Sequence, residues 1–120
     1  MKRMVFGFVV VVVLLTSSQA AAQELYFDLR TNYTPSEVGW VRVELIDRAD
    51  ERRTWTNLQQ ARGDFTRGIR IAELDGVSRG EYTLFVELLD GLMRTVHGRV
   101  WLFTMPNTVR HASTLLITRP

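Results

Sequence analysis

The sequence predicts an all-β protein that folds as a single antiparallel β-sandwich of about seven strands. From residue 23 onward, apolar and polar residues alternate over short runs, as they do in strands with one buried face. Glycine, proline, asparagine and aspartate separate these runs, which is typical of turns between strands. Because apolar residues do not recur at helical spacing for long in this region, strands are favoured throughout.

The first 22 residues have the layout of a secretory signal peptide. Lys2 and Arg3 form a basic start, Val5 to Leu15 form an apolar run, and Ala20 and Ala22 offer the small side chains that signal peptidase selects. The run holds eleven residues, fewer than the roughly 20 that a membrane-spanning helix needs. We therefore expect cleavage after residue 22 and export of residues 23–120 to the periplasm, the cell surface or the medium, without a transmembrane anchor.

The predicted mature domain, residues 23–120, carries no formal net charge. It contains thirteen arginines, no lysine and thirteen acidic residues, whereas the whole chain carries +2. This balance argues against nucleic-acid binding, because the phosphate backbone is bound chiefly through excess positive charge. The arginine bias and the style of the signal peptide favour a bacterial source. The chain has no cysteine, so disulfides and thiol chemistry are excluded.

Two strands open the domain. In the first, Leu25, Phe27 and Leu29 alternate with their neighbours, and the segment Asn32 to Glu37, which contains a proline, ends the strand. The second strand runs from Gly39 to Asp47 and is followed by a charged turn.

The middle of the chain shows a weaker pattern. We expect a strand from Arg52 to about Leu58, and residues 57–64 fit either a helical turn or an irregular crossover. Ile69 and Ile71 then mark the inward face of the next strand, which continues to Leu74.

The clearest passage is Gly76-Val77-Ser78-Arg79-Gly80-Glu81-Tyr82-Thr83-Leu84, which leads into a strand with an inward face formed by Tyr82, Leu84, Val86 and Leu88. This passage resembles the corner of carboxypeptidase-regulatory-like and other bacterial immunoglobulin-like or transthyretin-like domains. The resemblance implies a single immunoglobulin-like antiparallel β-sandwich, in which the tyrosine ring is buried and its hydroxyl reaches backbone across the corner. It also implies an accessory, adhesive or spacer role. Immunoglobulin-like, fibronectin-like and transthyretin-like strand orders all fit the pattern.

Two further strands complete the domain. Asp90-Gly91 predicts a two-residue hairpin turn, because both residues tolerate positive φ angles. A strand from Leu92 to Phe103 follows, interrupted by Gly98, and after a turn Val109 to Thr118 form the last strand.

The chemistry-bearing residues fit no catalytic or metal-binding pattern, so we expect neither an enzyme nor a cofactor. If the last two strands form a hairpin about residues 105 and 106, His97 lies opposite Thr114, and His111 is too distant to share a zinc ion. No serine has the strained, glycine-flanked setting of a hydrolase nucleophile. Arginines interleave with the acidic residues of turn 47–51, which argues against a calcium site.

The tryptophans are the strongest functional hint. Trp40, Trp55 and Trp101 fall out of phase with, or beside, the expected inward residues, and Phe85 has the opposite phase to the inward residues of its strand. Exposed rings stack on sugars or anchor a protein partner, although large aromatics fill cores as readily.

We therefore expect a small exported, non-catalytic module that binds a protein partner, with Trp40, Trp55, Trp101 and Phe85 as candidate contacts. One alternative is a carbohydrate-binding module in which exposed tryptophans hold a glycan. A second alternative is an inhibitor or chaperone that offers an edge strand to its target, and Val109 to Thr118 form the candidate strand.

Overall fold

The computed structural model describes residues 23–120, which form seven strands and no helix. The strands are β1 (Glu24–Thr31), β2 (Trp40–Asp47), β3 (Thr54–Gln60), β4 (Ile69–Asp75), β5 (Gly80–Leu89), β6 (Thr95–Met105) and β7 (Arg110–Ile117). This confirms the all-β prediction. The predicted signal peptide lies outside the described residues.

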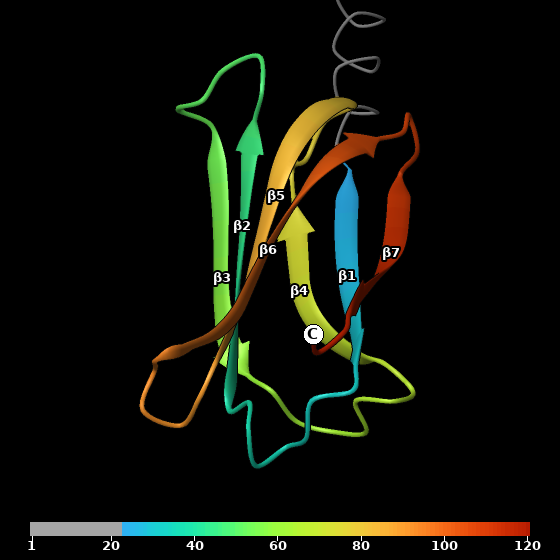
Figure 1. Cartoon of the computed structure of the whole chain (residues 1–120). Helices are drawn as coiled ribbons and strands as arrows, with labels where there is room; N and C mark the ends of the chain where they lie inside the picture. The colour runs from blue at the N-terminus through green and yellow to red at the C-terminus, as the bar shows by residue number, and fades with distance from the viewer. Residues whose placement is uncertain (1–22) are drawn as a thin grey trace, which may run out of the picture.

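The strands form two stacked sheets (Figure 1). One has three strands in the order β4-β1-β7, and the other has four in the order β3-β2-β5-β6. Four of the five pairings are antiparallel, but β1 and β7 run parallel over eight residue pairs. The antiparallel expectation is wrong for this pair, because the first and last strands meet side by side and the whole intervening chain serves as their crossover.

The core lies between the two sheets and follows the predicted alternation. Leu25, Phe27 and Leu29 point inward from β1, as expected, and are almost completely buried. The inward residues of β5 are buried as well: Tyr82, Leu84, Val86 and Leu88. Ile69 and Ile71 are buried on β4, as the sequence predicted. Period-two alternation therefore identified the core faces of these strands.

The corner motif has the geometry that the resemblance implied. The Tyr82 ring is 1 % exposed, and its hydroxyl donates a 2.7 Å hydrogen bond to the Ser78 carbonyl. Gly76 supplies a positive φ of 73° at the turn, a conformation that side chains with a Cβ rarely adopt. The corner thus joins β4 of one sheet to β5 of the other.

The β5–β6 hairpin differs from its prediction. Its loop has three residues between Asp90 and Arg94, and the positive φ of 64° falls on Met93, not on Gly91. The Asp90 carboxylate accepts hydrogen bonds from the amides of Leu92 and Arg94, each 2.9 Å long, which favours the longer loop. As a consequence β6 begins at residue 95, later than expected.

Residues 57–64 form no helical turn. The first four extend β3, and the chain then crosses to β4 through irregular turns in which Phe65 is buried. The irregular crossover was thus the better of the two interpretations, over fewer residues than expected.

Candidate functional site

The outer face of the four-stranded sheet carries an apolar patch. Ile46, Phe85, Val100 and Leu102 point away from the core, because their strand neighbours point into it. Ile46 lies on the same rung as Leu102 with Thr83 between them, and Phe85 lies directly opposite Val100. Val100 is 57 % exposed and Leu102 is 74 % exposed. We call these four residues the outer apolar patch.

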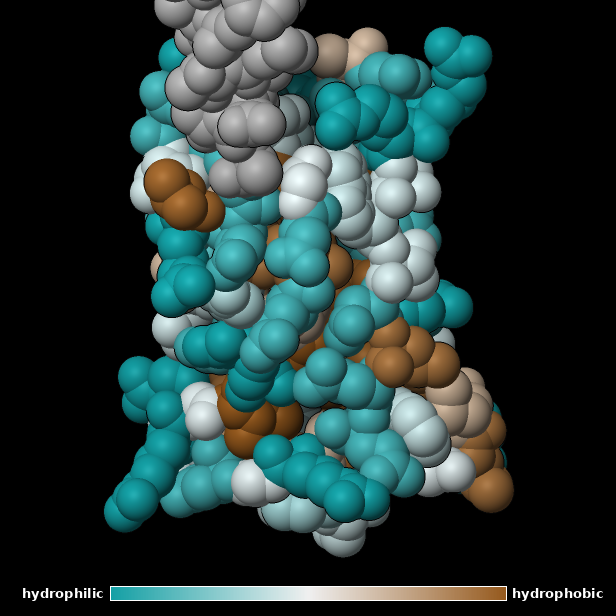
Figure 2. Space-filling view, turned by 180° about the vertical axis from the view of Figure 1, so that it is seen from behind, coloured by the Kyte–Doolittle hydropathy of each residue, from teal (hydrophilic) through white to brown (hydrophobic). Residues whose placement is uncertain are grey.

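The patch continues toward the β5–β6 hairpin. Leu92, Met93 and Val96 at the hairpin are also exposed. In the view from behind, hydrophobic side chains gather at the lower right, where this hairpin lies, on a surface that is otherwise mostly hydrophilic (Figure 2). Large apolar side chains on the described surface are thus concentrated on and around β6.

β6 is also a free edge of its sheet. It is the longest strand of the described chain, with eleven residues, and it pairs with β5 on one side only. β6 and β7 leave a common turn and diverge into different sheets (Figure 1). The sequence-based pairing of His97 with Thr114 is therefore wrong, because a β6–β7 hairpin does not form.

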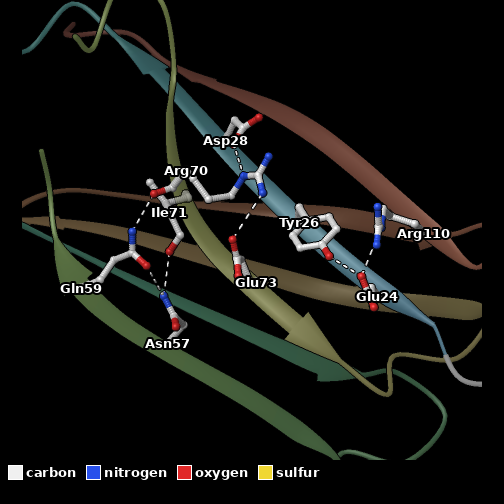
Figure 3. Close-up of polar contacts among 9 residues, drawn as sticks. All are labelled: Glu24, Tyr26, Asp28, Asn57, Gln59, Arg70, Ile71, Glu73 and Arg110. Atoms are coloured by element: carbon white, nitrogen blue, oxygen red, sulfur yellow. Dashed lines mark hydrogen bonds and ion pairs between the residues drawn. The ribbon is translucent and has the colours of Figure 1, made fainter. Parts of the chain in front are cut away.

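The edge of β4, in contrast, is covered by side chains of β3 (Figure 3). The side-chain amide of Asn57 donates to the Ile71 carbonyl at 2.7 Å, and that of Gln59 donates to the Arg70 carbonyl at 2.6 Å. The Trp55 indole N–H donates to the Asp75 carbonyl at 3.0 Å. These contacts occupy acceptors that an incoming strand would need. The sandwich is therefore closed at its β3–β4 side.

The candidate contact residues divide between the two faces of the four-stranded sheet. Trp40 and Phe85 lie on the outer face, where both are half-buried. Trp55 and Trp101 lie on the inner face, on one rung with Leu45 and Leu84. Both pack against the core, which is one of the two positions that the sequence left open for these rings. Because β6 carries apolar residues on both faces, its sequence does not show which face is buried.

The outer face of the three-stranded sheet carries a charged network centred on Tyr26 (Figure 3). The Tyr26 hydroxyl donates to Glu24, which also pairs with Arg110 at 3.1 Å. On the other side of the ring, Arg70 lies 4.8 Å from its centroid and pairs with Asp28. Each arginine of this network therefore has an acidic partner within the face.

The network shifts the pKa values of its members in ways that oppose acid–base catalysis. The hydrogen bond from Tyr26, followed by the effect of Arg110, lowers the pKa of Glu24 below its ordinary value. The same hydrogen bond raises the pKa of the Tyr26 phenol. A carboxylate that stays ionised and a phenol that stays protonated are poor proton shuttles near neutral pH.

The histidines make separate contacts. Nδ1 of His97 lies 2.9 Å from the Tyr33 hydroxyl, and Nε2 of His111 lies 3.0 Å from the Ser113 hydroxyl. Sequence reasoning missed the His111–Ser113 pair, although its i,i+2 spacing on one strand face would have revealed it. A catalytic triad also needs a third group on the other histidine nitrogen, and no hydrogen bond to that nitrogen occurs among residues 23–120. The described residues contain no cluster of three metal-ligating side chains.

The acidic turn after β2 is internally paired. Asp47 pairs with Arg53, and Asp50 pairs with Arg52. A nearby hollow of about 370 Å³ is lined by Arg48, Ala49 and Glu81, of which the first and last pair at 3.6 Å. This hollow does not border the candidate aromatic residues.

Comparisons with protein-family models, curated proteins and solved structures give no match. The function of this chain must therefore be argued from its own surface. Residues 23–120 contain no helix that is long and apolar enough to cross a membrane.

Proposed function

We propose that this chain is an exported, non-catalytic β-sandwich module that binds a protein partner on the outer face of its four-stranded sheet. The observation that carries the proposal is the outer apolar patch, Ile46, Phe85, Val100 and Leu102. Contiguous apolar groups on a sheet face exposed to solvent favour association, because covering them removes apolar area from water. Polar residues such as Glu44 and Arg42 border the patch, as in the polar rim of a binding surface.

Export rests on the sequence. The basic start, the short apolar run and the small residues before residue 23 support a cleaved signal peptide and a bacterial periplasmic or extracellular location. The non-catalytic part rests on the chemistry of the described surface, where most charged side chains pair with a neighbour of opposite charge and the histidines make separate contacts.

The strand order supports one of the three sandwich types that the sequence left open. In the constant-type immunoglobulin order, the first strand lies beside the second. Here β1 lies between β4 and β7, and β2 lies between β3 and β5. Together with the Gly76–Leu84 corner motif, this order favours the carboxypeptidase-regulatory-like, or transthyretin-like, arrangement over the immunoglobulin-like one.

Two other functions are less favoured. A glycan platform needs several exposed rings, but of the three tryptophans only Trp40 points outward. An edge-strand inhibitor that uses the last strand would need free backbone groups on β7, and the Leu116 carbonyl already accepts a 3.1 Å hydrogen bond from Arg99. β7 does lie at the edge of its sheet, as expected.

Photo-crosslinking tests the proposal at the centre of the patch. Phe85 is replaced by p-benzoylphenylalanine in cells of the source organism, and the matched control carries the same group at Leu116, which is 60 % exposed on the outer face of the other sheet. We expect a discrete adduct with a different protein from position 85 only. Identical adducts from both positions, adducts with a second copy alone, or none from either would refute the proposal. Binding of soluble glycans that is lost in Trp40→Ala would instead support the carbohydrate alternative.

A further inference from the structure

The β6 edge differs from the β4 edge in what protects it. Natural edge strands are protected by charges, prolines, bulges or covering side chains. Within Thr95–Met105 the one formally charged side chain is Arg99, and there is no proline. The β4 edge, by comparison, is covered by side chains of β3. A long, apolar, unprotected edge is a template for pairing with another strand.

From this geometry we propose that two copies of the chain pair antiparallel through β6, with Val100 of each copy on the two-fold axis. The two four-stranded sheets then become one continuous sheet of eight strands. Val100 is the middle residue of β6, so this register pairs the strand with itself over its whole length. The proposal goes beyond the partner-binding function, because it pairs the edge of the sheet and covers part of the outer apolar patch with a second copy of the chain.

The side chains of β6 complement one another in this register. Leu102 of one copy lies opposite Gly98 of the other. At Gly98 a Cβ would lie 3.7 Å from the Phe85 ring, so the missing side chain leaves the ring accessible beside a notch. The exposed Leu102 side chain fits over this notch and packs on Phe85, which buries two apolar groups that are solvated in the single copy.

Charge supports the same register on the inner face. Arg99 of one copy lies opposite Trp101 of the other. Within one chain the Arg99 guanidinium lies 5.0 Å from the Trp101 ring centre and donates a 3.1 Å hydrogen bond to the Leu116 carbonyl. Sliding one copy by two residues along the other in one direction would place Arg99 opposite Arg99 of the other copy. Like charges directly opposite each other destabilise a strand pair. The opposite shift would place Thr104 opposite Gly98 and leave Leu102 without the notch.

Single-cysteine variants test the pairing and its register, since the chain has no cysteine of its own. Only residues directly opposite their own copy lie close enough for a disulfide. We expect Val100→Cys to form a disulfide-linked dimer under mild oxidation of the purified exported protein, whereas Gly98→Cys and Leu102→Cys do not. Thr114→Cys, on the outer face of β7, is the control for random collision. Linkage at position 98 or 102 but not at 100 would refute the register, and equal linkage at all positions would refute the pairing.

Sedimentation velocity provides a second measurement that needs no cysteine. We expect the unaltered protein to sediment as a dimer, and Val100→Arg to weaken the dimer at least about tenfold, because two like charges face each other on the axis. Leu116→Arg, a charge on the other sheet, should leave the dimer unchanged. Circular dichroism checks that both variants stay folded. A monomer at the highest soluble concentration, or a dimer that Val100→Arg leaves intact, would overturn the proposal. Because only this chain is present, failure here leaves the crosslinking test at Phe85 unaffected.

Discussion

At the scale of single residues, two side chains hold the corner of the sandwich. Tyr82 buries its ring in the core and donates its hydroxyl to the Ser78 carbonyl. Gln23 is 5 % exposed, and its side-chain amide donates to the carbonyls of Pro106 and Thr108. The backbone carbonyl of Gln23 accepts hydrogen bonds from the amides of Gly76, at 2.9 Å, and Val77. The start of the described chain is therefore tied to two turns that the sequence places far away.

Removal of the Tyr82 hydroxyl tests the corner. We expect Tyr82→Phe to lower the free energy of unfolding by about 1–2 kcal/mol, because the part-buried Ser78 carbonyl loses its donor while the ring still fills the core. Urea unfolding followed by tryptophan fluorescence measures the change. Tyr26→Phe is the matched control, since the Tyr26 hydroxyl lies on the outer face of the three-stranded sheet. An equal loss of unfolding free energy in both variants would show that the Tyr82–Ser78 hydrogen bond stabilises the fold no more than a surface hydrogen bond does.

At the scale of elements, the two sides of the sandwich are built differently. On one side β3 leans over β4 and satisfies its carbonyls with side chains that alternate along the strand (Figure 3). On the other side β6 and β7 belong to different sheets and diverge (Figure 1). The polar residues of β3 therefore have a structural role, which is to cover the β4 edge. The exposed apolar residues of β6 have no such role within the described chain and favour binding of a partner.

Replacement of the covering amides tests this account of β3. We expect the double variant Asn57→Ala, Gln59→Ala to lose about 1–2 kcal/mol of stability, because the part-buried bond to the Ile71 carbonyl and the exposed bond to the Arg70 carbonyl of β4 are both lost. The double variant should also aggregate faster, because the β4 edge becomes available for pairing. Chemical denaturation and light scattering measure the two effects. Gln60→Ala, an exposed residue of the same strand, should change neither. If the double variant matched Gln60→Ala, the bonds to β4 would have no protective role.

At the scale of the whole molecule, many ion pairs join neighbouring side chains on the surface of residues 23–120, whose formal charges sum to zero. Four carboxylates, one in β1 and three in connections between strands, have pKa values below their ordinary values. The first cause in each is a hydrogen bond: from the Tyr26 hydroxyl to Glu24, from the Thr34 amide to Glu37, from the Thr66 hydroxyl to Asp64 and from the Arg94 amide to Asp90. Such lowered values mean that the folded state prefers the ionised forms.

Acid should therefore destabilise the domain. A carboxylate whose folded-state pKa is lowered stabilises the fold above its unfolded-state pKa, and this stabilisation is lost as the pH falls through the folded-state value. We expect the urea midpoint to drop below about pH 4.5. The variant Glu24→Gln, Glu37→Gln, Asp64→Asn, Asp90→Asn should show a flatter acid limb, since its amides do not titrate. An unchanged acid limb in this variant would assign the effect to other carboxylates.

The sequence by itself determined the fold class, the core faces of β1, β4 and β5, and the corner motif, because alternation and turn chemistry are local properties. It did not determine which strands pair. The parallel pairing of β1 with β7, the separation of β6 from β7 and the covering of β4 by Asn57 and Gln59 all depend on contacts between distant residues.

Among the candidate contact residues, the sequence identified Phe85 as part of a second apolar face but left the faces of Trp55 and Trp101 open. In a strand with apolar residues on both faces, such as β6, the alternation does not show which face is buried. The neighbouring strands and the other sheet decide this. The tertiary structure therefore located the exposed edge and the outer apolar patch, since solvent exposure depends on what the rest of the chain leaves uncovered.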